Sequence, residues 1–451
     1  MGGEARGGRV ACWAASALLI LSSLGAHGAE ALKPRTILIL PYQTELSRQE
    51  QWLGEGVAQI LSLALAQHPA FLQVDRVRLA RLGEPHLWGE PAILAAARSL
   101  KADTALYGQI ERVSGDLVLR PRYLELRSGG GDARALEALT VQEDKLLDQL
   151  PAIALAYFRA FRIPLSDAQA ASIEKAARPT ASLRAFEAFV RGRVAALTET
   201  QQGNETAADL LARAVELDPN FAVAHYALGV VHQALGNRWK AAAQFRASAQ
   251  LAPTYPEPFK ALGDLFLSAP RRLYEQAVEA YQKAIELRPF YAEAYVGLGD
   301  ARAAKADVDG AVAAYQQALA YNPNNPKVHL SLGKIYYSEK GLYYEAVGAY
   351  KRAIELDSQF LEARMGLGEV YEDKGLYQDA IAEYRKVVEV DARHTGALYN
   401  LALVHEKVDP REAIAHWEAY IAVASQLPSE KDWVDVARQH LKKLKGQVDK
   451  P

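Results

Sequence analysis

The chain has 451 residues, of which 50% are hydrophobic and 24% are charged, and its formal net charge is −2. This composition is typical of a globular protein and excludes a fibrous or disordered chain. Because the charges are nearly balanced, the sequence supplies no strongly basic surface for phosphate groups, and we expect no nucleic-acid partner.

Residues 1–28 have the pattern of a secretory signal peptide. Two arginines precede the apolar run VACWAASALLILSSLG, and Ala26 and Gly28 provide small side chains for cleavage before Ala29. The run is shorter than the roughly 20 residues that span a bilayer, which favours cleavage over a membrane anchor. No later segment approaches transmembrane length. We therefore expect an exported protein without a transmembrane segment in the mature chain, located in the periplasm.

Cys12 is the only cysteine, and it lies within this signal peptide. Because the apolar run is not followed by a small-residue motif ending in cysteine, no lipoprotein anchor is expected. The mature chain would have no thiol, which excludes disulfides and metal sites with cysteine ligands.

Residues 34–162 do not repeat and alternate between strand and helix patterns. TILILPY and FLQVDR are short apolar runs typical of strands, and segments 47–67 and 91–102 have helical apolar spacing. Ser47 is a candidate cap for the first of these helices. Two alternating runs then meet at Ser114-Gly115 in a predicted hairpin.

A third alternating run, ARALEALTVQE, follows the turn SGGGD at 128–132, and LLDQLPAIALAYFRAF ends the region as a predicted helix. This order predicts an α/β domain with a mixed sheet.

The same order resembles the N-terminal domain of the TolB protein and the TolB-like domains fused to repeat regions in other bacterial proteins. The resemblance rests on ILILPY, on the helix containing LGEGVAQILSLAL, and above all on ADTALYGQIERVSGDLVLRPRYLEL. RPTASLRAF at 178–186 matches the turn that leads from this domain into the next module. The β-propeller that follows the domain in TolB is missing here, so the resemblance implies no role that depends on a propeller.

From residue 185 the sequence repeats itself, and after the first repeat the spacing is 34 to 36 residues. An alanine follows most of the recurring small residues, and an aromatic ring stands four positions later, as in Ala277/Tyr281 and Ala346/Tyr350. A proline follows in three of the repeats. The recurring small residues are Gly192, Gly229, Gly263, Gly299, Gly333, Gly368 and Ala402.

A period near 34 with Leu-Gly, Ala-x-x-x-aromatic and Pro is the signature of the tetratricopeptide repeat. Residues 185–427 are therefore identified as seven such repeats, each a pair of antiparallel helices. Gly and Ala fit where helices cross closely, the ring fills the adjacent space, and Pro ends the second helix. The predicted fold class is mainly α: an α/β domain followed by an all-α superhelical solenoid.

The segments that flank the repeats have their own predictions. Residues 163–184 are expected to form a helical connector, and 428–446 an amphipathic helix that caps the last repeat. The first repeat has about three extra residues within TETQQGNET, where Asn204 begins a formal glycosylation sequon in a predicted loop. Terminal repeats are often atypical, which accounts for the extra residues. Because the chain is of bacterial type, we interpret the sequon as a chance match.

We find no motif for catalysis, a cofactor or a metal. His225 and His232 lie seven residues apart on one predicted helix, but they occupy aromatic core positions of the repeats, as do His329 and His405. A metal site would need a third ligand, and no cysteine is available. SGGGD joins two strands and predicts a hairpin turn rather than a phosphate loop. The motifs G-x-S-x-G and H-E-x-x-H do not occur.

The first helix of each repeat is expected to line the concave face of the solenoid. Aromatic rings there would anchor a partner, and charges of both signs would orient it, although any one partner would contact only about a third of them. The alternative is an ordinary solvated surface. The repeat register places the following residues on this face: Tyr226, Lys260, Asp264, Asp300, Lys334, Tyr337, Glu369, Glu372, Tyr399 and Asn400.

The sequence thus predicts an exported, non-enzymatic scaffold or adaptor of the bacterial cell envelope that binds a peptide or protein in its concave groove. One alternative is an assembly chaperone or structural subunit of an outer-membrane, secretion or polysaccharide-export complex. Another is an enzyme with its site at the domain junction, and a third is a sensory module. The sequence assigns neither the partner nor an oligomeric state.

Overall fold

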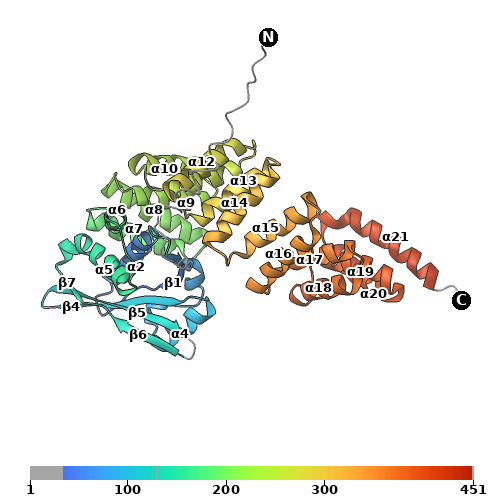
Figure 1. Cartoon of the computed structure of the whole chain (residues 1–451), viewed down its shortest axis with the longest axis horizontal. Coiled ribbons are helices and arrows are strands. Elements are labelled where there is room, and N and C mark those ends of the chain that lie inside the picture. Colours follow the sequence, from blue (N-terminus) through green and yellow to red (C-terminus); the bar gives the residue numbers. More distant parts are fainter. Residues whose placement is uncertain (1–33, 128–129, 449–451) are drawn as a thin grey trace, which may run out of the picture.

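The structure, a computed structural model, describes residues 34–127 and 130–448. The predicted signal peptide with Cys12, and residues 128–129 of the SGGGD turn, lie outside the described residues. A mixed sheet with flanking helices precedes a long series of helix pairs, as Figure 1 shows. The predicted fold class is therefore confirmed.

The N-terminal region is built on a seven-stranded sheet. Its strands are β1 (Arg35–Ile39), β2 (Gln43–Thr44), β3 (Phe71–Gln73), β4 (Thr104–Val113), β5 (Asp116–Arg127), β6 (Gly130–Ala135) and β7 (Leu139–Val141). β1 pairs in parallel with β3 and β4, whereas β5 pairs antiparallel with β4, β6 and β7. The sheet is mixed, as predicted, and the β4–β5 hairpin turns at Ser114-Gly115, where both residues have positive φ.

Helices cover both faces of this sheet. They are α2 (Trp52–Leu65), α3 (Arg76–Ala80), α4 (Glu90–Ser99) and α5 (Leu146–Ala160), with short turns η1 (Pro85–Leu87) and η2 (Glu143–Lys145). Ile37 and Ile39 of β1 pack with α2 and α5 on one face, and Leu38 packs with α3 and α4 on the other. A strand buried on both faces has a continuous apolar run, which explains TILILPY.

Two details predicted for this region were wrong. ARALEALTVQE is not one strand: β6 ends at Ala135, the Leu136 amide donates to the Pro121 carbonyl, and β7 then pairs with another part of β5. Ser47 does not cap α2. Its hydroxyl donates to Glu50 in the turn before the helix, so the hydroxyl serves that turn instead.

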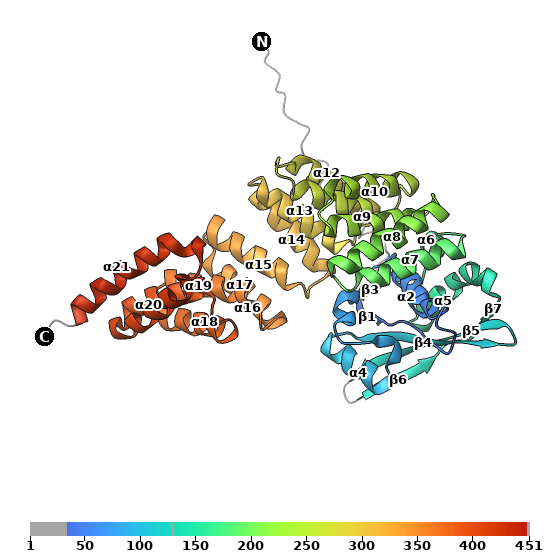
Figure 2. The ribbon, with the colours of Figure 1, turned by 180° about the vertical axis from the view of Figure 1, so that it is seen from behind.

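The C-terminal region consists of helix pairs followed by a final helix (Figures 1 and 2). The pairs begin at α7 and end at α20, with α6 before them. The elements are α6 (Asp167–Ala176), α7 (Leu183–Ala196), α8 (Gln201–Leu217), α9 (Ala222–Ala234), α10 (Arg238–Leu251), α11 (Glu257–Leu267), α12 (Tyr274–Leu287), α13 (Ala292–Ala304), α14 (Val308–Tyr321), α15 (Pro326–Lys334), η3 (Ile335–Glu339), α16 (Tyr343–Leu356), α17 (Leu361–Asp373), α18 (Tyr377–Val390), α19 (Thr395–Val408), α20 (Pro410–Ala424), η4 (Pro428–Glu430) and α21 (Lys431–Val448).

The recurring glycines and rings pack together. Gly263 of α11 and Gly297 of α13 both contact the Tyr281 ring of α12, and a Cβ on Gly263 would approach that ring to 2.7 Å. Since real Cβ atoms do not come so close, only glycine fits there. The Tyr281 hydroxyl donates to Asp264 over 2.7 Å. One ring therefore joins its own repeat to the next, as Tyr350 does between α15 and α17.

The two regions share one hydrophobic cluster. Phe186 of α7 contacts Gly56 of α2, and its ring centroid lies 6.0 Å from that of Trp52. Ile173 of α6 is fully buried in the same cluster, which runs from the sheet through α6 and α7 to α9. The expected connector, 163–184, is therefore packed in part between the sheet helices and the first pair.

The sequon at Asn204 was predicted to lie in a loop, but residues 201–206 of TETQQGNET are helical. Thr200 accepts a hydrogen bond from the Gly203 amide and caps α8, so Asn204 lies in the first turns of that helix. The extra residues lengthen α8 because a threonine cap precedes them.

The segment 428–446 forms η4 and most of α21. Val434, Ala437 and Leu444 are buried and pack against α20. Among the described residues, no helix is long and apolar enough to cross a bilayer.

Candidate functional site

The first helices of the pairs form an inner face that has two parts. The N-terminal region lies against α9, α11 and α13, whereas α15, α17 and α19 extend away from it (Figures 1 and 2). We call the first part the covered inner face, defined by Tyr226, Lys260, Asp264 and Asp300. The second part is the open inner face, defined by Lys334, Tyr337, Glu369, Glu372 and Asn400.

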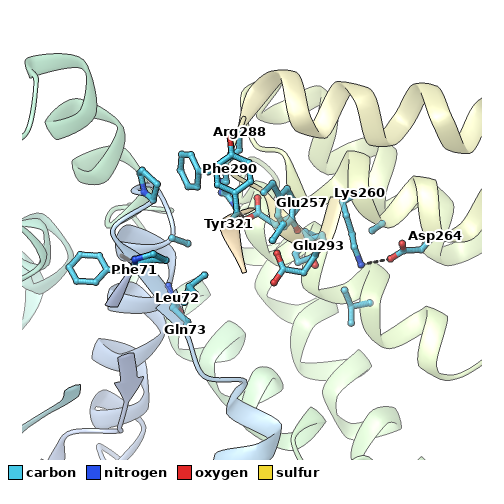
Figure 3. Close-up of a pocket in the computed structure, with 18 of the residues that line it drawn as sticks. Phe71, Leu72, Gln73, Glu257, Lys260, Asp264, Arg288, Phe290, Glu293 and Tyr321 are labelled. Carbon is cyan, nitrogen blue, oxygen red and sulfur yellow. Dashed lines mark hydrogen bonds and ion pairs between the residues drawn. The ribbon is translucent and has the colours of Figure 1, made fainter. Parts of the chain in front are cut away.

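A cavity of about 850 Å³ separates the covered inner face from the N-terminal region. Figure 3 shows Leu72 and Gln73 of the sheet side on one wall and Glu257, Lys260 and Glu293 on the other. The predicted groove is therefore walled on one side here by another part of the same chain.

The predicted residues of the covered inner face have partners within the repeats. Lys260 forms an ion pair with Asp264 at 2.7 Å, and Asp264 also accepts the Tyr281 hydroxyl. Asp300 accepts the Tyr315 hydroxyl. Burial raises the pKa of Asp300, and the hydrogen bond from Tyr315 opposes that shift. These carboxylates therefore stabilise the core rings of their own repeats.

The cavity wall also contains a buried ion pair. Arg288 lies 2.8 Å from Glu257, and their side chains are only 8% and 16% exposed. The Arg288 guanidinium lies 5.0 Å from the Tyr291 ring centroid. Within the described chain, Glu257 Oε2 and Arg288 Nη2 have no hydrogen-bond partner. Sequence reasoning missed this pair because the two residues lie far apart in the chain and outside the Leu-Gly register.

The open inner face presents both charged and aromatic side chains. Lys334 and Glu369 are exposed, and Tyr337 is partly exposed with its hydroxyl donating to Asp373. Glu372 accepts the Tyr384 hydroxyl at 3.1 Å. This surface combines ionic groups with a positioned ring, as protein-binding surfaces do.

A π turn places Tyr337 on this surface. The repeat from Gly333 to Gly368 is 35 residues long, one more than the preceding step. The extra residue is accommodated in η3, where the Lys340 amide donates to the Ile335 carbonyl over 3.1 Å. π turns are rare and frequently occur at functional sites. The spacing was visible in the sequence, but its structural form was not predicted.

Tyr399 lies in a different environment. Its ring centroid is 5.0 Å from that of Trp417, 5.3 Å from Tyr420 and 5.6 Å from Trp433. These rings join α19 to α20 and to α21. Tyr399 is therefore part of the contact that holds the last helix.

His225 is satisfied within its own repeat. Its Nδ1 lies 2.7 Å from Gln244 Oε1, and its Nε2 lies 3.2 Å from the Pro219 carbonyl oxygen. This arrangement agrees with the interpretation of His225 as a core histidine.

The open inner face is predicted to make stability depend on pH. Loss of hydration raises the pKa of Glu369 and of Glu372, and repulsion by Asp373 adds to both shifts, whereas Lys334 lowers the pKa of Glu369. A carboxyl whose pKa is raised by folding binds a proton more readily in the folded than in the unfolded state. Its contribution to the free energy of unfolding therefore falls as pH rises from the ordinary glutamate pKa through the raised value.

Glu369→Gln/Glu372→Gln should therefore gain stability relative to the natural chain as pH increases through that window. The difference should stay below about 1 kcal/mol, because both groups are partly hydrated. Thermal unfolding of both proteins in steps between about pH 4 and pH 7 measures it. A constant difference across the window would contradict the proposed coupling.

Comparison with known proteins supports the repeat assignment. Residues 274–306 and 299–340 match a family model described as TPR repeat, and residues 337–397 match one described as Tetratricopeptide repeat. The chain is 34% identical over 111 residues to the small glutamine-rich tetratricopeptide repeat-containing protein 2 of Mycosarcoma maydis, covering 25% of this chain and 31% of that protein. It is 31% identical over 121 residues to human (Homo sapiens) tetratricopeptide repeat protein 13, and this match covers 27% of this chain and 14% of that protein.

The chain thus spans less than a third of each of these relatives. Among solved structures, that of MamA is similar, with 28% identity and a TM-score of 0.33, covering 36% of this chain and 93% of MamA.

Proposed function

Because residues 274–397 are tetratricopeptide repeats, we propose that the chain is a non-enzymatic scaffold that binds a protein or peptide partner along its open inner face. The observation that carries this proposal is the division of the inner face. The N-terminal region lies opposite α9, α11 and α13 across the cavity, whereas Lys334, Tyr337 and Glu369 face solvent. Concave solenoid surfaces are suited to extended partners.

The charge of the open inner face defines the kind of partner. Among the residues that define the open inner face, the two carboxylates Glu369 and Glu372 outnumber the one cation, Lys334. A partner segment with basic side chains opposite α17 would complement these carboxylates, and Tyr337 would contact an apolar side chain of the same segment.

The cellular setting is part of the same proposal. Region 34–162 acts as a TolB-like domain, and the chain works in the bacterial cell envelope after residues 1–28 are removed. The resemblance of ILILPY and of the β4–β5 hairpin sequence to TolB-like domains supports the first statement, and the leader pattern supports the second. N-terminal sequencing of the protein from its native cells should give Ala29 as the first residue. Retention of Met1 in the native protein would contradict export with cleavage.

Exchanging the charges of Lys334 and Glu369 should weaken partner capture without unfolding the repeats. Lys334→Glu/Glu369→Lys keeps opposite charges at the two positions but reverses the pattern that a partner meets. Like charges opposed across an interface cost several kcal/mol, so we expect the dissociation constant to rise about tenfold or more. Affinity isolation from native cells identifies the partner, and titration of that purified partner measures the change.

The control variant is Lys283→Glu/Glu286→Lys. These residues form an exposed ion pair on α12, with side chains 43% and 68% exposed, outside the open inner face. The control should bind the partner as the natural chain does. If both variants bind equally well, or if the first loses binding only because its melting temperature falls, the open inner face is not the binding surface.

A further inference from the structure

Three potential metal ligands meet between α19 and α20 in the last helix pair. They are His405 of α19 and Glu412 and His416 of α20, and one ligand atom from each lies within 4.8 Å of the others. Glu412 and His416 are four residues apart and therefore share one face of α20. The two imidazole rings are stacked, with centroids 4.4 Å apart.

His405 is buried without a hydrogen-bond partner. Its side chain is 4% exposed, and neither ring nitrogen makes a hydrogen bond within the described chain. Nδ1 lies 3.3 Å from Glu412 Oε2, but the geometry is not that of a hydrogen bond. Leaving a buried polar group unsatisfied costs about 1–3 kcal/mol, so a ligand that engages these nitrogens would stabilise the pair of helices.

We propose that His405, Glu412 and His416 form a binding site for a divalent transition-metal ion of the Zn²⁺ class. Two imidazoles and one carboxylate are a donor set that suits Zn²⁺ and related ions, whereas Mg²⁺ and Ca²⁺ prefer oxygen ligands alone. Three protein ligands leave a fourth position for water. The proposal departs from the sequence prediction, which placed His405 in an aromatic core position and expected no metal site.

The site closes by movement of the two partly exposed side chains. Zn–N bonds of about 2.0–2.1 Å put tetrahedral ligand atoms roughly 3.3 Å apart, closer than the present limit of 4.8 Å. Glu412 is 55% exposed, so it can rotate toward the buried His405. The imidazole of His416 must turn out of the stack so that one ring nitrogen faces Nδ1 or Nε2 of His405.

The surrounding charges set the conditions for binding. Burial lowers the pKa of both His405 and His416, with Glu412 opposing and Arg385 adding to each shift; Asp409 also raises the pKa of His405. These shifts favour the neutral form of both imidazoles, which is the form that binds a metal ion. The Arg385 guanidinium lies 3.5 Å from Glu412 Oε2 and competes with a metal for that carboxylate.

Calorimetric titration of the full chain with Zn²⁺ tests the site. We expect one Zn²⁺ per chain, with a higher melting temperature on addition of Zn²⁺ and no response to Mg²⁺. Glu412→Gln and His416→Gln should each weaken Zn²⁺ binding at least tenfold (about 1.4 kcal/mol). Both positions are partly exposed, so these variants should fold. Binding should also weaken on acidification as the imidazoles protonate.

Two further variants separate this site from adventitious binding. His329→Gln removes a partly exposed histidine of α15, whose Nε2 lies 3.4 Å from the Pro323 carbonyl oxygen, and should leave Zn²⁺ binding unchanged. Arg385→Gln removes the cation that competes for Glu412 and should therefore tighten Zn²⁺ binding. The proposal is overturned if 1:1 binding is absent, if His329→Gln weakens binding as much as His416→Gln, or if Arg385→Gln has no effect.

Discussion

Tyr281→Ala is expected to lower the free energy of unfolding by about 3–5 kcal/mol. The Tyr281 ring is fully buried and contacts Gly263 on one repeat and Gly297 on the next. Two glycine backbones cannot move in to fill the space left by the ring, so a cavity would remain between the repeats. Because each repeat of a solenoid is stabilised by its neighbours, the loss should reach both sides. Chemical denaturation, monitored by circular dichroism, measures this loss in the free energy of unfolding.

Two variants separate the contribution of the ring from that of the hydroxyl. Tyr281→Phe removes only the hydrogen bond to Asp264 and should cost about 1 kcal/mol. Tyr344→Ala removes a tyrosine that is 91% exposed and should change stability by no more than about 0.5 kcal/mol. A similar loss for Tyr281→Ala and Tyr344→Ala would contradict the role given to the recurring ring.

Arg288→Met is expected to cost about 3–5 kcal/mol, because it leaves Glu257 as an unpaired charge in the cavity wall. The side chains of this ion pair are 8% and 16% exposed, so water screens the remaining carboxylate poorly. Methionine preserves much of the arginine volume, which restricts the loss to the charge. Thermal and chemical denaturation at neutral pH measure the change.

The double variant Glu257→Met/Arg288→Met tests the same argument. Removing both charges of a buried ion pair is often neutral or stabilising, so the double variant should be more stable than Arg288→Met alone. If Arg288→Met costs less than about 1 kcal/mol, or if the second substitution restores nothing, the pair is not held in a poorly hydrated wall.

The repeats were predictable because their packing is encoded locally. A glycine such as Gly333, an alanine such as Ala346 and a ring such as Tyr350 recur at nearly fixed spacing, and each contact joins helices that are neighbours in the chain. Strand β1 was predictable for a different reason: Ile37, Leu38 and Ile39 are buried on both faces of the sheet and form a continuous apolar run.

The features that the sequence did not reveal depend on contacts between distant segments. The position of the N-terminal region opposite α9, α11 and α13 requires the first helix pair to pack on α2, where Gly56 meets Phe186. No periodicity encodes that contact. His405 matched the aromatic core position of its repeat, and its proximity to His416 depends on how α19 faces α20. Ten concave residues were predicted as one surface, whereas the structure divides them among the covered inner face, the open inner face and the Tyr399 cluster.

Site-specific photocrosslinking in native cells tests the central claim most directly. A photoreactive amino acid is placed at Tyr337 or Asn400 on the open inner face, and at Tyr344, which is exposed on α16, as the control. We predict that positions 337 and 400 crosslink to the same protein, that position 344 does not, and that Lys334→Glu/Glu369→Lys strongly reduces the yield of both adducts. Adducts from position 344 alone, or adducts that persist in the charge-exchanged variant, would contradict binding along the open inner face.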